Sequence, residues 1–470
     1  MQSLVPSFIS NSISSSFVNW AYNFLFKEYL TKTKYGCIQI EIDDKYYSQY
    51  STVNSKPLVF GDINCHGDLQ CKITIVNLYR FLFKIIFGGD IGFSETYILG
   101  DFDTSNLSLL IKIFILNRNE LDELDSKWAF LKHKVDRILH LVHKNTIEGS
   151  KENIKAHYDL SNEMFQLFLD PTMSYSCAYF STPQDTLEQA QLNKIRLLID
   201  KANISSHHHI LEIGTGWGAL AIEAVKRTGC RVTTISISDA QVQLATERVK
   251  QAGLQDRITI LNTDYRTLQG KFDRVISCEM LEAVGLENLG TYFNCIDNLL
   301  TNDGLVVIQF IATNDQRLPV YSKGCDYIQK YIFPGSFCPP ITSIVNAVTD
   351  NTKLVLDNME NMGPHYALTL NSWKQNFLAN REKIFNLGFD QQFIRMFLYY
   401  FAYCESAFET RSISLIQMVY SRPCNSNNLP FYLPRKTPDP TPAKPSSPPS
   451  PTLKSILPIQ QETPTITNNI

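Results

Sequence analysis

The stretch LEIGTGWG, residues Leu211–Gly218, decides the fold of this 470-residue chain. An apolar strand pattern at Ile210–Ile213 ends at Gly214, and Gly216 and Gly218 follow at alternate positions before a helical pattern begins. Glycines at such a turn let the backbone bend tightly and let a ligand approach the main chain closely. The stretch therefore predicts a strand–turn–helix unit that binds a nucleotide-like cofactor.

Strand and helix patterns alternate downstream of this turn. Strands are expected at residues 232–237, 258–262, 274–278 and 305–310, and helices at 219–227 and 240–252. Strands that are separated by amphipathic helices pair in parallel and build an open sheet with helices on both faces. The fold class that we expect is therefore α/β, with a doubly wound, Rossmann-like sheet.

Two features of the turn favour S-adenosylmethionine over a dinucleotide. The spacing is G-x-G-x-G instead of G-x-G-x-x-G, and Glu212 precedes the first glycine by two residues, where a carboxylate can place a water or an ammonium group. A third feature argues against NAD but does not single out S-adenosylmethionine. No acidic residue ends the second strand, and Asp239 comes only after it. We expect hydroxyls or Gln241 to hold the ribose and Tyr265 to cover the adenine. An ordinary glycine turn of another α/β enzyme is the alternative.

Composition and charge limit the partners. Hydrophobic residues make up 44% of the chain, and the formal net charge is −3. Nucleic-acid-binding domains are normally basic, so no nucleic-acid partner is expected. The 11 cysteines show no C-x-x-C spacing, which favours a reduced, cytoplasmic compartment. His207–His209 has no cysteine or carboxylate at ligand spacing, so we interpret it as a solvated linker and expect no metal.

Composition also divides the chain into four parts. We expect an aromatic-rich helix at 1–36, a small α+β module at 37–120, a catalytic domain at 121–424 and a disordered tail at 425–470. The tail is rich in Pro, Ser and Thr, and it cannot bury enough apolar surface to offset the entropy of ordering it.

Within the small module, strands are expected at 37–47, 58–60 and 71–75, a helix at 107–116 and turns at 88–102, whereas 78–87 fits a buried helix or a strand. Residues 125–144 carry helical spacing. His140 and His143 lie on that pattern and are interpreted as surface or packing residues, because a metal site needs more ligands.

The aromatic segment Phe17–Tyr29 raises the question of a membrane contact. No apolar run reaches the ~20 residues that span a bilayer, and the N-terminus lacks the pattern of a secretory signal. The segment is dense in aromatics with few charges, which suits a membrane interface. The alternative is a helix that caps the first domain. We therefore expect a cytoplasmic protein with peripheral contact to membranes.

Several separate blocks resemble the cyclopropane fatty acid synthase family of S-adenosylmethionine-dependent methyltransferases. The blocks are HYDLSNEMFQLFLDPTMSYSCAYF (157–180), LEIGTGWGALAIEAVKRTGCRVTTISISDAQ (211–241), CEMLEAVG (278–285), YIFPGSFCPP (331–340), GPHYALTLNSWKQNF (363–377) and LGFDQQFIRMFLYYFAYCESAFETR (387–411). Their order and spacing agree with the family from about residue 144 to residue 423. Residues 90–111 are similar to the N-terminal module of that family.

The resemblance implies a class I methyltransferase fold and an enzyme of lipid metabolism. Its reaction transfers a methylene group from S-adenosylmethionine to the cis double bond of an unsaturated acyl chain in a membrane phospholipid, and forms a cyclopropane. A homodimer would also be compatible with the family resemblance. The cofactor-binding residues that it implies are Tyr175, Ser176, Gly214, Gly216, Gly218, Ser236, Ile237, Gln241, Tyr265 and Arg266.

In this family a bicarbonate ion takes the proton that ring closure releases. The residues that the resemblance assigns to its site are Cys177, Glu282, Tyr366 and Cys404, with the backbone of Ile311. The family histidine falls, by its spacing from Glu282, on Gln309, which donates a hydrogen bond but cannot titrate.

Three alternatives stay open. The departure at Gln309 keeps a methyl-branched lipid as the product, and the scaffold also resembles small-molecule N-methyltransferases. A non-catalytic lipid-binding protein is a third, and it is disfavoured because the glycines of the turn and Glu282 are present. Taken alone, Cys177 and Cys404 fit ordinary core cysteines better than catalytic ones, and it is the joint match of the blocks that favours the site.

Overall fold

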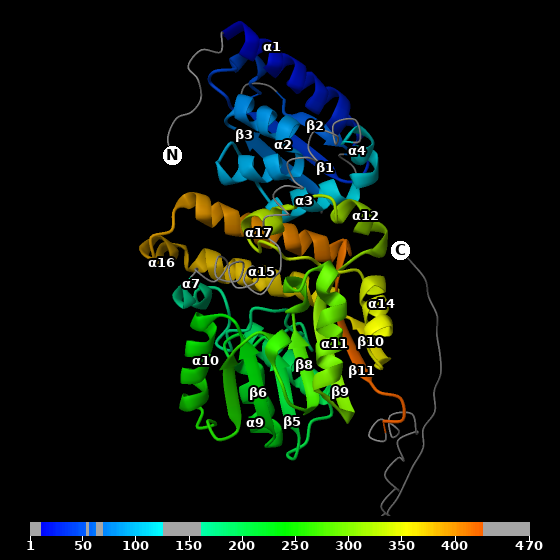
Figure 1. The fold of residues 1–470 in the computed structure, drawn as a ribbon. Coiled ribbons are helices and arrows are strands. Elements are labelled where there is room, and N and C mark those ends of the chain that lie inside the picture. Colours follow the sequence, from blue (N-terminus) through cyan, green and yellow to red (C-terminus); the bar gives the residue numbers. More distant parts are fainter. Residues whose placement is uncertain (1–10, 53–55, 63–68, 126–160, 426–470) are drawn as a thin grey trace, which may run out of the picture. The chain divides into compact units, whose positions relative to one another are not determined.

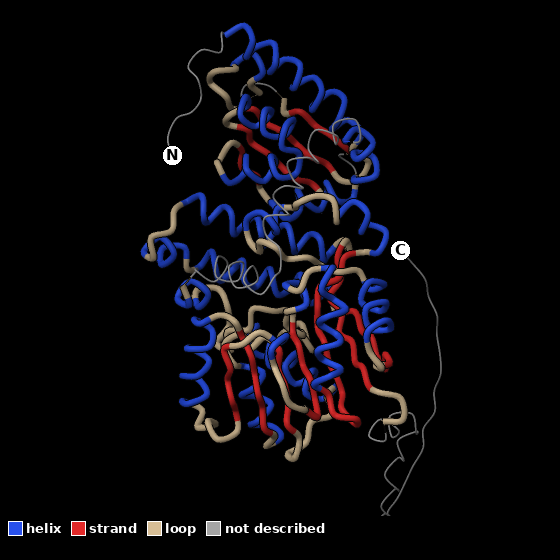
Figure 2. Tube along the Cα trace, viewed as in Figure 1, coloured by secondary structure: helices blue, strands red, loops and turns tan. Residues whose placement is uncertain are grey.

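The computed structural model describes residues 11–52, 56–62, 69–125 and 161–425. The chain divides into residues 1–425 and 426–470, and the second unit lies outside the described residues. The predicted tail therefore stays a prediction, as does the helical pattern with His140 and His143. Within the described part, the strands form one seven-stranded and one four-stranded sheet (Figures 1 and 2).

The elements have the following bounds. The strands are β1 (Cys37–Ile42), β2 (Leu58–Gly61), β3 (Gln70–Ile75), β4 (Phe102–Thr104), β5 (His209–Ile213), β6 (Arg231–Ser236), β7 (Ile258–Asn262), β8 (Phe272–Cys278), β9 (Leu300–Thr313), β10 (Val355–Asn361) and β11 (Ile413–Ser421). The α-helices are α1 (Asn11–Tyr22), α2 (Leu78–Ile98), α3 (Leu107–Leu116), α4 (Arg118–Asp125), α7 (Asn162–Gln166), α8 (Leu187–Lys201), α9 (Ala219–Thr228), α10 (Asp239–Gln251), α11 (Leu289–Leu299), α12 (Leu318–Tyr321), α13 (Tyr327–Tyr331), α14 (Ile341–Asn351), α15 (Gly363–Ala379), α16 (Arg381–Asn386) and α17 (Gln391–Glu409).

The large sheet confirms the expected α/β class. Its strand order is β10-β11-β9-β8-β5-β6-β7. Strands β5 to β9 pair in parallel, and β11 lies antiparallel between β9 and β10. The order reverses at β5, so the turn after β5 lies at the switch point where open α/β sheets bind ligands.

Alternation along the strands explains the two layers of helices. Ile210, Ile276 and Val307 belong to a buried cluster with residues of α8 and α9. Their neighbours Leu211 and Val306 belong to another cluster, with residues of α11 and α14. Successive side chains of a strand point to opposite faces, so strands that are apolar throughout must be covered on both sides.

The histidine run is not a solvated linker, apart from exposed His207. His208 is 8% exposed, and His209 lies in β5, where its imidazole is 2.9 Å from the Thr233 hydroxyl. The strand begins before the apolar run does, because its backbone pairs and Asp273 accepts the His209 N–H at 2.8 Å. Among the described residues no group of three or more His, Cys, Asp or Glu is arranged to hold a metal ion.

The small module is a four-stranded sheet of order β2-β1-β3-β4 with helices packed on it. The predicted turns are found only at 99–101 and are wrong for 88–98, because α2 continues through Ile98. The helix bends at Gly89, whose φ of 52° and ψ of −132° lie outside the helical range. A Cβ on Gly92 would lie 1.8 Å from the Lys84 carbonyl oxygen, so glycine there permits the bend. Glycines mark a kink here, not the end of the helix.

The first predicted strand is shorter than expected. Strand β1 ends at Ile42, and the Asp44 carboxylate accepts N–H groups of Tyr46 and Leu78, which starts α2. The aromatic segment at 17–29 forms the end of α1 and a π-helix (η1, Asn23–Tyr29).

That aromatic segment packs on α2 and also leaves aromatic surface exposed. Leu25 and Phe26 are buried, and Phe17 stacks on Phe87. Trp20 and Phe87 are 44% and 61% exposed. The segment therefore covers the module, and its contact with a membrane stays a prediction. In the part of the chain that is described, no helix has the length and apolarity to cross a bilayer.

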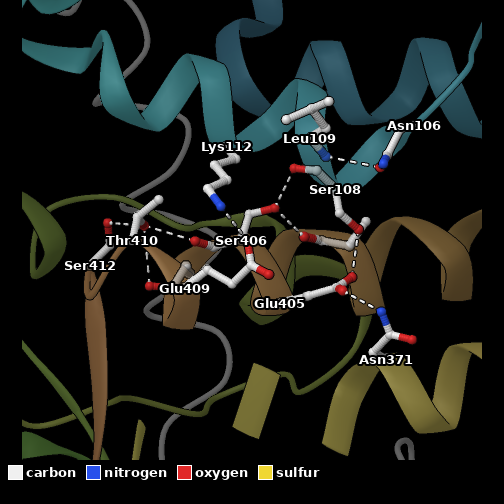
Figure 3. Close-up of polar contacts among 12 residues, drawn as sticks. Asn106, Ser108, Leu109, Lys112, Asn371, Glu405, Ser406, Glu409, Thr410 and Ser412 are labelled. Atoms are coloured by element: carbon white, nitrogen blue, oxygen red, sulfur yellow. Dashed lines mark hydrogen bonds and ion pairs between the residues drawn. The ribbon is translucent and has the colours of Figure 1, made fainter. Parts of the chain in front are cut away.

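Helices α15 and α17 lie side by side across the end of the sheet where the glycine turn is found (Figure 1). Their contact is aromatic, with Phe377 stacked on Phe397 and Trp373 fully buried. Helix α17 also contacts α3 of the small module: Ser406 donates to the Ser108 carbonyl at 2.6 Å, and Ser108 donates to Glu405 at 2.5 Å (Figure 3).

Glu405 is the buried acid of this junction. Its carboxylate accepts from Asn371 of α15 and pairs with Lys374 of α15, and its side chain is 6% exposed. By contrast Lys112 and Glu409, which also join α3 to α17, are 32% and 38% exposed. A buried charge that loses its partner is penalised far more than an exposed one.

We predict that Lys374→Met lowers the free energy of unfolding by about 3 kcal/mol, because it leaves the Glu405 carboxylate buried without a cation. The matched variant Lys112→Met should change it by less than about 1 kcal/mol. Denaturant unfolding of the full chain measures both. Equal effects of the two variants would contradict the prediction.

Candidate active site

A cavity of about 400 Å³ lies at the carboxyl ends of the central strands. Its floor is made by residues that follow β5, β6 and β8, together with Ile311 of β9, and its walls include Tyr366 of α15 and Cys404 of α17. Of the predicted site residues, Cys177, Gly218 and Gln309 do not line it. Those that do are Tyr175, Ser176, Gly214, Gly216, Ser236, Ile237, Gln241, Tyr265, Arg266, Glu282, Tyr366 and Cys404.

The glycine turn forms one end of the cavity. The N–H groups of Gly214 and Thr215 both donate to the Ile235 carbonyl at 3.0 Å, which ties the turn to β6. Gly216 has a φ of 50°, and a Cβ there would meet no atom within 4 Å, so its backbone is open to a ligand. Gly218, with a φ of 86°, starts α9 against Ala245 and shapes the turn without touching the cavity.

The end of β6 carries a hydroxyl–amide pair in place of an acid. Ser236 donates to the Gln241 side-chain oxygen at 2.9 Å, and both line the cavity. Asp239 contacts Asn262 and is not part of the lining. A hydroxyl and the Gln241 amide therefore lie together in the lining, and their contact with the ribose stays a prediction.

Tyr265 and Arg266 lie beside this pair. Tyr265 meets Tyr292 edge-on at a ring distance of 5.3 Å, and burial raises the pKa of its phenol to about 12, so it stays neutral. The Arg266 guanidinium is held by Asp264 at 2.7 Å. A neutral aromatic ring fixed at the end of the third strand can cover an adenine face.

Among the described groups that line the cavity, the Glu212 carboxyl is the one best suited to bind a cation. The residue is 4% exposed, and among the described residues its Oε2 has no hydrogen-bond partner. Burial raises the pKa of this carboxyl to about 8, against lowering contributions from Thr234 and Lys194. A buried carboxyl that lacks a partner is stabilised in its ionised form when a positive ligand binds. The residues at this end of the cavity fit S-adenosylmethionine.

A second group of lining residues is organised around Glu279, which the sequence reasoning missed. Its Oε1 accepts the Cys177 backbone N–H at 2.8 Å and the Gln309 amide at 2.6 Å. Its Oε2 accepts the Tyr366 hydroxyl at 2.6 Å. Three predicted site residues thus meet on a carboxylate that belongs to the chain.

Gln309 and Cys177 donate to the Glu279 carboxylate and do not themselves line the cavity. Gln309 is fully buried, and its own oxygen accepts from Gln417, the residue opposite it on β11, at 2.8 Å. The Cys177 thiol is fully buried and donates to the Ala178 carbonyl at 3.2 Å. Burial and the Glu279 charge hold the pKa of this thiol well above its ordinary value. Cys177 therefore contributes its backbone N–H, and Gln309 its amide, to Glu279.

Glu282 lies next to Glu279 and is less well satisfied. Its Oε1 accepts the Ile311 N–H at 2.5 Å, and its Oε2 has no partner within the described residues. Burial and the adjacent Glu279 raise the pKa of the Glu282 carboxyl to about 8. Glu279 has more donors than Glu282, so a single negative charge of the pair is better placed on Glu279.

A bicarbonate ion does not fit beside these side chains. The groups that the family resemblance assigns to it include Cys177, Tyr366, position 309 and the Ile311 backbone. In this structure all four donate to Glu279 or Glu282. Three of these groups donate to the Glu279 carboxylate, which the resemblance did not assign to the site.

The sequence carried a signal for one of the two missed residues, Glu279, but not for the other, Lys194. Glu279 directly follows β8 and stands three residues before Glu282, in the motif from which only Glu282 was taken. Lys194, on α8, is 3% exposed, lines the cavity and donates to the Ser176 hydroxyl at 2.6 Å. Its helical periodicity is that of a packing residue, so the sequence carried no signal for it.

Comparisons with known proteins identify the family of this chain. A sequence model of the family described as mycolic acid cyclopropane synthetase matches residues 145–418. Tuberculostearic acid methyltransferase UfaA1 of Mycobacterium tuberculosis is 36% identical over 341 residues, which are 71% of this chain and 79% of that protein. Cyclopropane-fatty-acyl-phospholipid synthase of Escherichia coli is 32% identical over 383 residues, 81% of this chain and 94% of that protein.

Solved structures give the same result for the fold. The cyclopropane synthase MmaA2 from Mycobacterium tuberculosis superposes with a TM-score of 0.55 at 25% identity, covering 58% of this chain and 98% of that one. Mycolic acid cyclopropane synthase CmaA1, solved in complex with SAH and CTAB, superposes with a TM-score of 0.55 at 27% identity and the same coverage. The large sheet and its helices therefore have the class I methyltransferase fold.

We predict that binding of S-adenosylmethionine at pH 7 releases up to one proton, because a Glu212 carboxyl with a pKa of about 8 is mostly protonated before the cation arrives and ionised afterwards. Titration calorimetry in buffers of different ionisation enthalpy measures the release. Glu212→Gln should abolish it, whereas Glu223→Gln, which removes a carboxylate from α9, should leave it unchanged. Equal release by the Glu212 variant would refute this assignment.

Proposed function

Because this chain belongs to the mycolic acid cyclopropane synthetase family of S-adenosylmethionine-dependent methyltransferases, we propose that it adds a methylene group to the cis double bond of an unsaturated phospholipid acyl chain and forms a cyclopropane. The observation that carries the proposal is the cavity itself. Its lining combines the glycine turn with the Glu279 and Glu282 carboxyls and with aromatic side chains.

The glycine turn and its neighbours would bind the cofactor. Gly214 and Gly216 admit the ligand to the backbone, Glu212 meets its ammonium group, and Ser236 with Gln241 faces the ribose. Bound there, S-adenosylmethionine supplies a methyl group that its sulfonium makes electrophilic. The chain has to place an alkene in line with that methyl and to keep water out.

The aromatic part of the lining suits an alkene and the positive charge that forms on it. An alkene carries no proton that must be removed first, so no base is needed at the start. Attack leaves a cation on the acyl chain, and the faces of aromatic rings stabilise a cation. Tyr175, Phe333 and Tyr400 line this part of the cavity, with Tyr175 and Phe333 at a ring distance of 5.9 Å.

The rest of the lining suits a lipid. Ile328, Leu370 and Phe408 supply apolar surface for an acyl chain. Arg118 of α4 and Arg317, which precedes α12, line the same cavity, and guanidinium groups favour phosphate. Peripheral membrane contact, cytoplasmic localisation and a homodimer belong to this proposal as predictions.

A second product has specific support. The 36% identical relative is named a tuberculostearic acid methyltransferase, and the family histidine is replaced by Gln309. If a hydride shifts along the chain before the proton leaves, the same methyl transfer gives a methylene-branched acyl chain in place of a ring. This alternative differs from the first only in the fate of the cation.

The lipid product tests the proposal. Purified protein is incubated with vesicles of an unsaturated phosphatidylglycerol and methyl-labelled S-adenosylmethionine, and the acyl chains are analysed by mass spectrometry and proton NMR. We expect a label gain of one CH₂, loss of the olefin signals and new cyclopropyl signals. Vesicles of a saturated phospholipid are the control and should take up no label.

Terminal-alkene signals in place of cyclopropyl signals would assign the methylene-branched product. A protein that binds S-adenosylmethionine but labels no acyl chain would refute the lipid substrate.

A further inference from the structure

We propose that the Glu279 carboxylate is the base that removes the proton from the methylated acyl chain, so that this enzyme needs no bound bicarbonate ion. The inference rests on the proposed function, because it concerns the second half of that reaction. It adds a catalytic residue that the family resemblance did not assign.

The first argument is the position of Glu279. Its two oxygens accept from the Cys177 N–H, the Gln309 amide and the Tyr366 hydroxyl at 2.6–2.8 Å. The resemblance assigns the same three positions to bicarbonate. A carboxylate and a bicarbonate both present two oxygens on one planar carbon, so either is held by the same donors. Here the carboxylate is covalently part of the chain.

The second argument is that the lining leaves a place for the proton. A carboxylate accepts about four hydrogen bonds, and the three donors leave one acceptor position free. Glu279 itself lines the cavity, beside Cys278 and Met280. The remaining lone pair is therefore available to a group in the cavity.

The third argument concerns the departure from the family pattern at position 309. Gln309, in the place of the histidine, donates to Glu279 and cannot titrate, so it does not compete for the proton. Its orientation is set by Gln417, whose own oxygen accepts from Lys201 at 2.7 Å. A fixed amide donor is what a built-in carboxylate requires, and this explains why glutamine serves at position 309.

The backbone at Glu279 supports a functional role. Its φ is 51°, a left-handed conformation that is unfavourable for glutamate, and its N–H donates to the Gln309 carbonyl at 2.7 Å. Such conformations persist where the surroundings enforce them and are frequent at active sites. The turn thereby aims the side chain between the Cys177 and Tyr366 donors.

Electrostatics agree with the assignment. Burial raises the pKa of Glu279, whereas the Tyr366, Cys177 and Gln309 hydrogen bonds and the nearby Lys194 ammonium lower it. The balance leaves a carboxyl that is more basic than an exposed one and still has enough donors to carry charge. Rates of proton transfer are greatest when the pKa of the base lies near the working pH.

The step balances without another reactant. The alkene π pair forms a carbon–carbon bond to the methyl group while the sulfur–carbon bond breaks and its pair stays on sulfur. The neighbouring chain carbon becomes cationic. Glu279 takes a proton from the new methyl group, and the freed C–H pair closes the ring. Glu279 ends as a neutral carboxylic acid that returns its proton to solvent after product release.

The experiment compares variants in buffer stripped of carbon dioxide, with unsaturated phosphatidylglycerol vesicles and labelled S-adenosylmethionine. The wild type should keep its rate within about twofold whether or not bicarbonate is added. Glu279→Gln should lose roughly 10²–10⁴-fold in turnover, the range for a general base, with unchanged affinity for S-adenosylhomocysteine. Glu287→Gln, an exposed carboxyl in the next turn, should keep the wild-type rate.

Glu279→Gly keeps the test open if the glutamine variant misfolds. Glycine adopts a φ of 51° without strain, and its lack of a side chain leaves the three donors free for a small anion. Added bicarbonate or formate should raise the rate of this variant at least tenfold, and should not raise that of Glu279→Gln, whose side chain still fills the place.

A wild type that forms product only when bicarbonate is present would overturn the proposal while leaving the proposed function intact. Full turnover by Glu279→Gln would do the same. A wild type that labels no lipid under any condition would remove the proposed function, and this inference with it.

Discussion

The Glu279 carboxylate draws three distant segments of the chain to one point: the loop at Cys177, strand β9 at Gln309 and helix α15 at Tyr366. A carboxylate removed from water is expensive by several kcal/mol unless donors replace its hydration. The upstream loop and α15 must therefore close over the end of the sheet for the charge to be tolerated. The same closure encloses the cavity, so the shape of the site and the stability of its charge have one cause.

The small module takes part in this closure. Helix α3 reaches α17 through Ser108, which bonds both Glu405 and Ser406 (Figure 3). Arg395 of α17 also donates to the Phe102 carbonyl at 2.7 Å. Ile115 and Arg118 of the module line the cavity itself. The module therefore contributes to the site, and its aromatic surface at Trp20 and Phe87 lies on the same unit of the chain.

Two groups of lining residues follow different physical logic. Near the glycine turn, the open backbone of Gly216 and the Glu212 oxygen that has no partner among the described residues suit a positive ligand. The Glu279 carboxylate instead accepts three hydrogen bonds and keeps one acceptor position free. In the proposed function the first group binds the cofactor and the second removes a proton.

The sequence by itself determined the fold class and placed the glycine turn at the end of β5. The glycine turn, the alternating strands and the hydroxyl and amide at Ser236 and Gln241 are local patterns, and each lies within a few residues of the atoms it positions. The sequence did not predict the bend of α2 at Gly89, because glycine marks kinks as well as helix ends. It did not predict the burial of His208 either, because an imidazole is readily buried when it has hydrogen-bond partners.

Only the tertiary structure decided what Cys177, Gln309 and Tyr366 do. The sequence indicates that they belong to one site, but not that a fourth residue stands between them. Glu279 becomes central because β8 ends beside β9 and α15 folds over both, a matter of long-range packing that no local pattern encodes. Hydrogen bonds between residues 30 to 102 positions apart depend on the whole fold, and so does the chemistry that they support.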